Sequence, residues 1–262
     1  MTTQNLFTDG AGYERYMGLW SRLVGEAFLE WLAPKPGGRW LDVGCGNGAF
    51  TELIFDKAAP SSVKGIDPSE PQLDYARRRF SSRPSVFVKA DAMALPFPEG
   101  AFDAAVMPLV IFFVPEPPKG VAEMARVVAP GGLVAAYAWD MPGGGFPYAA
   151  VKEELSALGL EAAAEPNPDA SRLDSLMKLW KEAGLDAVET REISARRTFE
   201  SFDDYWATLQ GGPSLSRRLK EMASADLARL KERLRARLPA DKDGRIAYGA
   251  RANAVKGVVR LP

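Results

Sequence analysis

Three glycines alternate with other residues at the first strand-to-helix turn expected in this sequence. They are Gly44, Gly46 and Gly48, in the segment LDVGCGNG. Glycines at such a turn let the backbone reverse sharply and leave no side chain to block a ligand. The free amides at the start of the next helix suit a negatively charged group. Because Gly44-x-Gly46-x-x-Ala49 also satisfies a loose dinucleotide pattern, the turn predicts a cofactor site without deciding between cofactors.

Aspartates close to the ends of three successive strands narrow the choice of cofactor. Asp42 directly precedes the glycines, where it suits a cationic amino group and repels a pyrophosphate. Asp67 ends the second strand, where a carboxylate can accept both hydroxyls of a ribose. Asp91 follows the third strand and can bind an exocyclic amine such as that of adenine. The alternatives are a partner of loop amides for Asp42, a helix cap for Asp67 and a turn for Asp91.

The elements that position these residues alternate between strands and helices. Short connections between such elements predict a doubly wound, mostly parallel α/β sheet covered on both faces. The expected strands are 39–43, 62–66, 85–89, 102–108, 133–139, 185–198 and 245–259, and the expected helices are 16–32, 49–56, 71–80, 117–128, 148–158, 171–183, 202–209 and 215–238.

The 262 residues are interpreted as a single domain with additions. Residues 1–34 form a helical cap at the amino-terminal side, and residues 141–184 and 200–240 are helical insertions. Both insertions are expected to overhang the carboxyl ends of the strands, where ligands bind in open α/β sheets. We therefore expect them to form a lid over the substrate, with the glycines at 143–145 as a hinge.

Composition excludes several classes of chemistry. The chain has no histidine and one cysteine, Cys45, so zinc sites and Ser-His or Cys-His hydrolase arrangements lack their residues. No metal is therefore expected, and Cys45 is interpreted as a small loop residue. A net charge of −1 gives no general attraction to nucleic acid or an anionic membrane. No apolar run is long enough to span a membrane and no signal peptide is evident, so a cytoplasmic location is expected.

The motifs resemble those of class I S-adenosylmethionine-dependent methyltransferases, in the bacterial group that acts on small molecules. LDVGCGNG is similar to the glycine-rich first motif of that family, and GIDPS to its acidic second motif. ADAMALPFPEGAFDAAV is similar to the stretch that joins the third and fourth strands, and RVVAPGG, with Pro130-Gly131-Gly132, to the turn before the fifth. The resemblance implies a seven-stranded sheet whose last strand is antiparallel, with S-adenosylmethionine as cofactor. It also implies that Asp67 holds the ribose, and that Asp91 and Ala92 hold the adenine.

The amino-terminal helix has two interpretations. Its aromatic residues have the spacing of core packing, and they can also close over the cofactor from the sulfonium side. Tyr13 belongs to the same set. The residues expected around the cofactor are Asp42, Gly44, Cys45, Gly46, Asp67, Pro68, Asp91, Ala92, Met107, Tyr16, Met17 and Trp20.

The expected reaction is in-line displacement of a methyl group onto a small, largely apolar acceptor. Phe112, Phe113 and Trp139 are the candidates for the acceptor pocket, and Asp140 is the candidate for a general base. Many relatives carry histidine in the segment that here reads Val110-Ile111-Phe112-Phe113-Val114, where this chain has only apolar residues, so a histidine base is not available. The alternatives are a non-catalytic S-adenosylmethionine-binding or regulatory protein and an NAD(P)-dependent oxidoreductase. The acceptor atom and the oligomeric state do not follow from the sequence.

Overall fold

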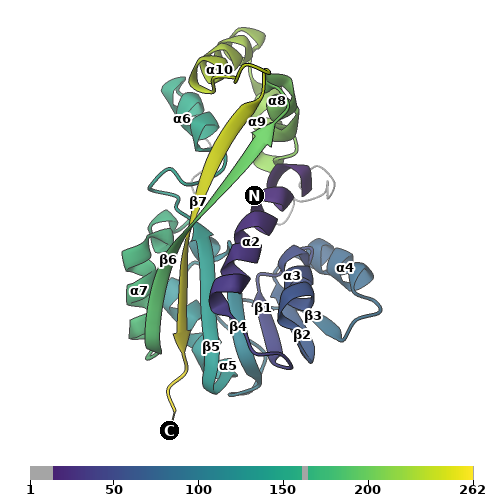
Figure 1. The fold of residues 1–262 in the computed structure, drawn as a ribbon, viewed down its shortest axis with the longest axis vertical. Coiled ribbons are helices and arrows are strands. Elements are labelled where there is room, and N and C mark those ends of the chain that lie inside the picture. The colour runs from purple at the N-terminus through teal and green to yellow at the C-terminus, as the bar shows by residue number, and fades with distance from the viewer. Residues whose placement is uncertain (1–13, 161–164, 262) are drawn as a thin grey trace.

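A seven-stranded sheet forms the centre of the protein in the computed structural model, which describes residues 14–160 and 165–261 (Figure 1). The strand order is β3-β2-β1-β4-β5-β7-β6. Strands β1 to β5 are parallel, and β7 runs antiparallel to both β5 and β6. This confirms the doubly wound, mostly parallel sheet with an antiparallel last strand. The strands are β1 (Arg39–Val43), β2 (Ser62–Asp67), β3 (Ser85–Lys89), β4 (Phe102–Pro108), β5 (Val128–Trp139), β6 (Asp186–Phe199) and β7 (Ile246–Val258).

Helices cover both faces of this sheet. On one face, α2 (Leu19–Leu32) packs against α3 (Ala49–Ala58) and against the last two strands. On the other, α5 (Pro117–Val127) packs against β4 and β5. Helix α4 (Glu70–Arg79) packs against β2 and β3. Since the central strands are buried on both sides, β4 is almost wholly apolar, as parallel sheets require.

Helix α7 (Leu173–Glu182) belongs to the layer that covers the sheet. It packs against β6, β7 and α5, and its buried face presents Leu176 and Trp180. The indole Nε1 of Trp180 donates to Val134 O of β5 at 2.8 Å. This corrects the expectation that residues 141–184 as a whole overhang the strand ends, because 173–182 cover a face of the sheet instead.

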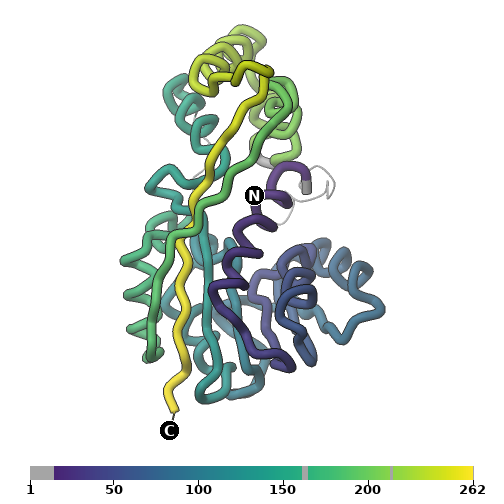
Figure 2. The backbone as a smooth tube through the Cα atoms, in the orientation of Figure 1, coloured from purple at the N-terminus to yellow at the C-terminus, as the bar shows by residue number. Residues whose placement is uncertain are grey.

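The last two strands extend beyond the sheet as a two-stranded ribbon. Pairing between β5 and β7 ends at Trp139 and Ala252, whereas β6 and β7 stay paired up to Phe199 and Ile246. We call residues 193–199 and 246–252 the ribbon. Figure 2 shows its two strands side by side as they leave the sheet. Because the pairing is continuous, the far end of the ribbon has a defined position above the sheet.

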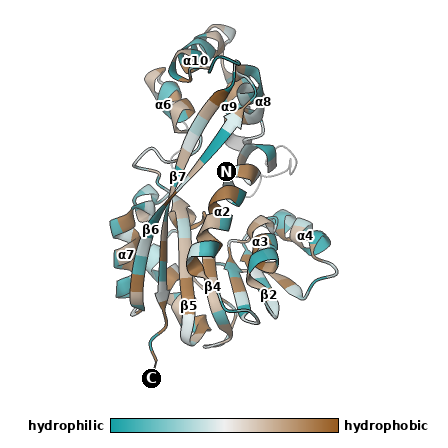
Figure 3. Cartoon of the chain, viewed as in Figure 1, coloured by the Kyte–Doolittle hydropathy of each residue, from teal (hydrophilic) through white to brown (hydrophobic). Residues whose placement is uncertain are grey.

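The far end of the ribbon carries a group of helices, which we call the lid helices (Figure 1). They are α6 (Ala149–Ala157), α8 (Phe202–Leu209), α9 (Pro213–Glu221) and α10 (Ser224–Arg237). Figure 3 shows α10 coloured largely as hydrophilic, whereas hydrophobic residues gather on the strands. The single helix expected at 215–238 is divided into α9 and α10, because Met222 and Ala223 adopt extended backbone angles.

Ion pairs join the two segments that contribute lid helices. Glu154 of α6 accepts from both Arg233 and Arg237 of α10, and Arg237 also binds Glu153. Glu154 is 8% exposed, and hydrogen bonding from Arg233 holds the pKa of its carboxyl below the ordinary value. Since α6 precedes β6 in sequence and α10 follows it, these contacts hold both segments together as one unit.

Candidate functional site

The glycine turn between β1 and α3 has the left-handed backbone that its composition predicts. Gly44, Gly46 and Gly48 have φ angles of +76°, +52° and +85°. A Cβ added to Gly44 would meet Val110 Cγ2 at 2.4 Å, so no side chain fits there. A Cβ added to Gly46 would meet nothing within 4 Å. The turn is therefore closed by Val110 at its start and open at Gly46, where a ligand can approach the backbone.

Asp67 ties this turn to the loop after β2. Its Oδ2 accepts from Gly46 N at 3.0 Å, and its Oδ1 accepts from Ser69 N at 2.8 Å. Burial raises the pKa of Asp67 despite these two hydrogen bonds. Each carboxylate oxygen has a second lone pair, so Asp67 can hold the turn and still accept from a ribose hydroxyl.

Asp42 is fully buried at the end of β1. Its Oδ2 accepts from Thr51 Oγ1 of α3 at 2.6 Å, whereas its Oδ1 has no hydrogen-bond partner among the described residues. Burial raises the pKa of Asp42 to about 7, and the nearby Asp67 adds to the rise. Thr51 was not singled out from the sequence, although a hydroxyl at a buried helical position beside Phe50 and Leu53 was a usable signal. The unpartnered oxygen is chemically suited to a cationic amino group.

The third aspartate lies in a turn that it also stabilises. Asp91 is exposed, and its Oδ1 accepts from Met93 N at 2.8 Å. Ala92 is half-buried and Pro68 is exposed. Cys45 is buried with α4 and β3, and burial raises the pKa of its thiol well above the ordinary value. The interpretation of Cys45 as a small packing residue therefore agrees with its surroundings.

The backbone after β4 is strained where it passes the glycine turn. Leu109 has φ +60°, which is uncommon for a branched side chain, and its N–H donates to Tyr137 O at 2.7 Å. Such conformations cost about 1–3 kcal/mol and often mark functional sites. The next residue, Val110, lies with its side chain against Gly44. Met107, expected near the cofactor, has a fully buried side chain near Gly120 of α5, so only its backbone is available to the rim.

The described amino-terminal residues that were expected to close over the cofactor are buried, and two of them contact Tyr148, which directly precedes helix α6. Tyr13 lies outside the described residues, whereas Tyr16, Met17 and Trp20 are buried. The ring of Tyr16 stacks on Tyr148 with centroids 4.3 Å apart. The Tyr148 hydroxyl accepts from Trp20 Nε1 at 3.2 Å and donates to Tyr16 O at 2.5 Å. These residues thus join the start of α2 to the lid helices.

The four residues expected around the acceptor have different surroundings. Phe113 is 46% exposed and contacts Phe112, which is 4% exposed, in a short helical turn at Ile111–Phe113. Trp139 is buried at the end of β5, so it does not line a pocket in this conformation. Asp140 pairs with Arg251 at 2.5 Å and accepts from Gly143 N at 3.1 Å. Because both carboxylate oxygens of Asp140 are engaged, the geometry favours a structural role and does not support a general base.

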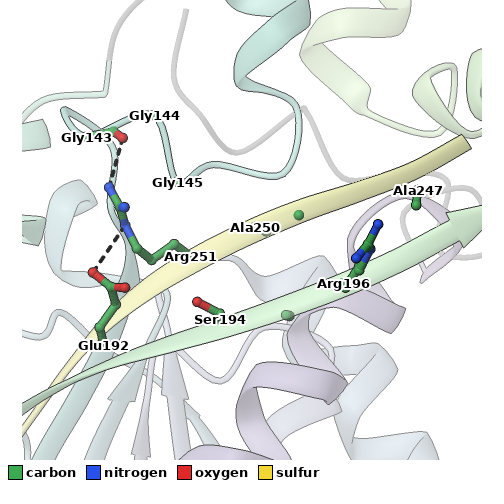
Figure 4. A pocket seen from close by; sticks show the side chains of 11 residues that line it. Gly143, Gly144, Gly145, Glu192, Ser194, Arg196, Ala247, Ala250 and Arg251 are labelled. Atoms are coloured by element: carbon green, nitrogen blue, oxygen red, sulfur yellow. Dashed lines mark hydrogen bonds and ion pairs between the residues drawn. The ribbon is translucent and has the colours of Figure 1, made fainter. Parts of the chain in front are cut away.

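Asp140 and Arg251 stand beside a shallow pocket of about 540 Å³ (Figure 4). The pocket lies between residues 143–145 and the face of the ribbon that carries Ser194 and Arg196. Arg251 also donates to Gly143 O, so the three-glycine loop is held against the ribbon. The loop expected to serve as a hinge is therefore fixed by side-chain contacts.

The arrangement suits S-adenosylmethionine better than a pyrophosphate-containing cofactor. The buried Asp42 presents an unpartnered oxygen for an ammonium, Gly46 leaves its backbone open, and Asp67 has spare lone pairs for ribose hydroxyls. Two carboxylates at the glycine turn would repel a pyrophosphate. The described residues contain no group of three His, Cys, Asp or Glu side chains able to hold a metal ion.

Comparison with known families gives the decisive observation. Residues 41–136 match a family described as "Methyltransferase domain". Over these residues the chain is similar to a methyltransferase domain. That domain includes the glycine turn, Asp42, Asp67, Asp91 and Phe112.

Relatives of the methyltransferase domain include enzymes named for quinone biosynthesis. A demethylmenaquinone methyltransferase of Thermus thermophilus is 36% identical over 125 residues, which are 47% of this chain and 55% of that protein. A ubiquinone/menaquinone biosynthesis C-methyltransferase of a Ruegeria species is 34% identical over 115 residues, or 42% of this chain and 46% of that protein. The chain thus spans about half the length of these relatives.

Solved structures extend the similarity of the methyltransferase domain to the whole fold. A putative methyltransferase of Bacillus halodurans superposes with a TM-score of 0.61 at 18% identity, covering 90% of this chain and 99% of that one. Phosphoethanolamine N-methyltransferase 2 of Haemonchus contortus, solved with S-adenosyl-L-methionine, gives 0.60 at 18% identity, covering 100% of this chain and 61% of that one. The sheet is therefore the Rossmann-like sheet of class I methyltransferases. Among the described residues, no helix has both the length and the apolar character needed to span a membrane.

Proposed function

We propose that the protein transfers a methyl group from S-adenosylmethionine to a small, largely apolar acceptor. Three observations at the glycine turn carry this proposal together: the buried Oδ1 of Asp42, unpartnered among the described residues, the open space beside Gly46, and the hydrogen bond from Gly46 N to Asp67. We further propose that the protein works in the cytoplasm, since its single cysteine fits a reducing compartment.

Cofactor placement would rest on residues at the ends of the first three strands. Asp42 would hold the amino group, Asp67 the ribose, and Asp91 with Ala92 the adenine. When bound, the cofactor supplies a methyl group on a positively charged sulfur. The remaining task of the chain is to position the two reactants, which contributes up to about 7–11 kcal/mol in well-aligned reactions.

The acceptor would lie between the short turn at Ile111–Phe113 and the lid helices. The turn contributes the rings of Phe112 and Phe113, whose centroids are 4.6 Å apart, and Asp140 is paired with Arg251 and so is not available as a general base. An acceptor that is already nucleophilic needs little help from a base. Reduced naphthoquinones are the first acceptors to test, because two relatives are named for quinone biosynthesis.

The first test is cofactor selectivity. We expect S-adenosylhomocysteine to raise the melting temperature, and NAD and NADP to leave it unchanged, because a ligand that binds only the native state stabilises it. Differential scanning fluorimetry with each ligand at equal concentration measures this. Stabilisation by NAD with no effect of S-adenosylhomocysteine would contradict the proposal.

The second test separates packing from acceptor binding at the two phenylalanines. Phe113→Ala is expected to leave stability and S-adenosylhomocysteine affinity near wild type while turnover falls, because Phe113 is 46% exposed. Phe112→Ala is expected to cost about 3–5 kcal/mol of stability, as for other buried aromatic residues. Urea unfolding, calorimetry and methyl transfer to 1,4-naphthalenediol give the three measurements. Normal turnover by folded Phe113→Ala would remove that residue from the pocket.

A further inference from the structure

A buried hydroxyl in the lid helices has no hydrogen-bond partner. The side chain of Tyr205, on α8, is 0% exposed, and its hydroxyl contacts no donor or acceptor within hydrogen-bond distance among the described residues. Its ring packs edge-on against Phe199, with centroids 5.1 Å apart, and at a tilt against Phe202, with centroids 6.2 Å apart. The ring of Tyr205 is therefore well packed, whereas its hydroxyl oxygen has no hydrogen-bond partner among the described residues.

Such an arrangement is costly unless the hydroxyl has a use. An unsatisfied buried polar group costs about 1–3 kcal/mol, and phenylalanine would fill the same space without that cost. Burial raises the pKa of Tyr205, so its hydroxyl keeps its proton and remains a donor. The structure thus places a neutral donor inside an aromatic cluster.

Among the described residues, the hydroxyls of two neighbouring tyrosines have hydrogen-bond partners, in contrast to that of Tyr205. Tyr148, whose ring centroid lies 6.2 Å from that of Tyr205, uses its hydroxyl for Trp20 Nε1 and Tyr16 O. Tyr248 accepts from Ala150 N at 3.4 Å. Through Tyr148 and Tyr16 this aromatic cluster continues to the amino-terminal segment expected to cover the cofactor.

We propose that the Tyr205 hydroxyl donates a hydrogen bond to an oxygen atom of a flat aromatic acceptor that enters beside Tyr148. This proposal rests on the proposed function and specifies its substrate class. The rings around Tyr205 suit the face or edge of an aromatic molecule, and a protonated phenol requires an acceptor atom opposite it.

Two small-molecule probes that differ only in a hydroxyl or a methyl group test this proposal. 1-Naphthol and 1-methylnaphthalene have similar shapes, but only the first offers an oxygen. Both are titrated by calorimetry into the protein saturated with S-adenosylhomocysteine, for wild type, Tyr205→Phe and Tyr75→Phe. Tyr75 is an exposed tyrosine of α4 and serves as the matched control. Melting temperatures without ligand are measured for all three.

Wild type and Tyr75→Phe are expected to prefer 1-naphthol by about tenfold, the value of one good hydrogen bond. Tyr205→Phe is expected to lose that preference and to melt at the same or a higher temperature, because it removes an unsatisfied group. An unchanged preference in Tyr205→Phe, or no binding of either probe to wild type, overturns the proposal. Failure of S-adenosylhomocysteine to bind wild type would instead overturn the proposed function.

Discussion

Replacement of Asp67 by alanine is expected to weaken S-adenosylhomocysteine binding by roughly tenfold to a hundredfold. Hydrogen bonds from a ribose to a charged carboxylate contribute about 1.5–3 kcal/mol, which corresponds to this loss of affinity. The variant also loses the contacts to Gly46 N and Ser69 N, so the glycine turn would be less well ordered before binding. Isothermal titration calorimetry measures the change in affinity.

The control for Asp67→Ala is Asp74→Ala. Asp74 is an exposed residue of the neighbouring helix α4 and pairs only with Arg77 in the described structure. Its removal is expected to leave affinity unchanged, since exposed ion pairs contribute little. If folded Asp67→Ala binds as tightly as wild type, Asp67 acts only as a loop anchor.

Cofactor affinity is expected to rise with pH between about 5.5 and 7.5. Burial raises the pKa of Asp42 to about 7 in the ligand-free protein, so below that value the carboxyl is mostly protonated and cannot pair with an ammonium. A bound cation favours the charged form, so binding releases this proton and tightens as pH rises. Calorimetric titration of S-adenosylhomocysteine at several pH values measures the slope.

The same residue links stability to pH with the opposite sign. Its pKa is higher in the folded protein than the ordinary 3.8, so the stabilising contribution is present below about pH 4 and is lost as pH rises to about 7. Asp42→Asn removes this loss, and it should stabilise the ligand-free protein at pH 8 by up to about 4 kcal/mol. Its cofactor affinity should be weak and independent of pH. A pH slope that persists in Asp42→Asn would assign the proton to another group.

The strands were predictable because their signals are local. Apolar runs such as Phe102–Pro108, bounded by glycine and proline, gave the central strands, and the structure confirms them. The segment Pro130-Gly131-Gly132 was expected to be a turn but lies within β5. There Gly131 N donates to Val259 O and Val259 N donates to Gly132 O. That partner is more than a hundred residues away, so no local pattern could indicate it.

The periodicity of apolar residues identified which face of each helix is buried, but not the element against which that face packs. Leu176 and Trp180 of α7 predicted an amphipathic helix equally well for a lid or a sheet cover. The packing of α7 against β6, β7 and α5, together with the hydrogen bond from Trp180 to Val134 of β5, shows that it covers the sheet.

The sequence could predict which candidate residues lie at the ends of strands, but not the contacts of their side chains. The aspartates follow directly from motifs at those ends, whereas the Thr51 contact of Asp42 and the free hydroxyl of Tyr205 depend on side-chain directions. The contacts of Asp140 could not be predicted from the sequence either. Its position at the end of β5 suggested a base, but its pairing with Arg251 follows from the register of β5 and β7.

The ribbon has a consequence for how this protein can change over time. The chain between Phe199 and Ile246 enters and leaves through the far ends of β6 and β7. Inside the sheet, the pairing of these two strands is set by 186–193 and 252–258. Insertions or deletions at the far end therefore alter no register near the cofactor, and lengthening a loop costs little free energy. Selection can remodel the helices beyond the ribbon while the cofactor-binding half stays constant, so new acceptors can arise without rebuilding the catalytic core.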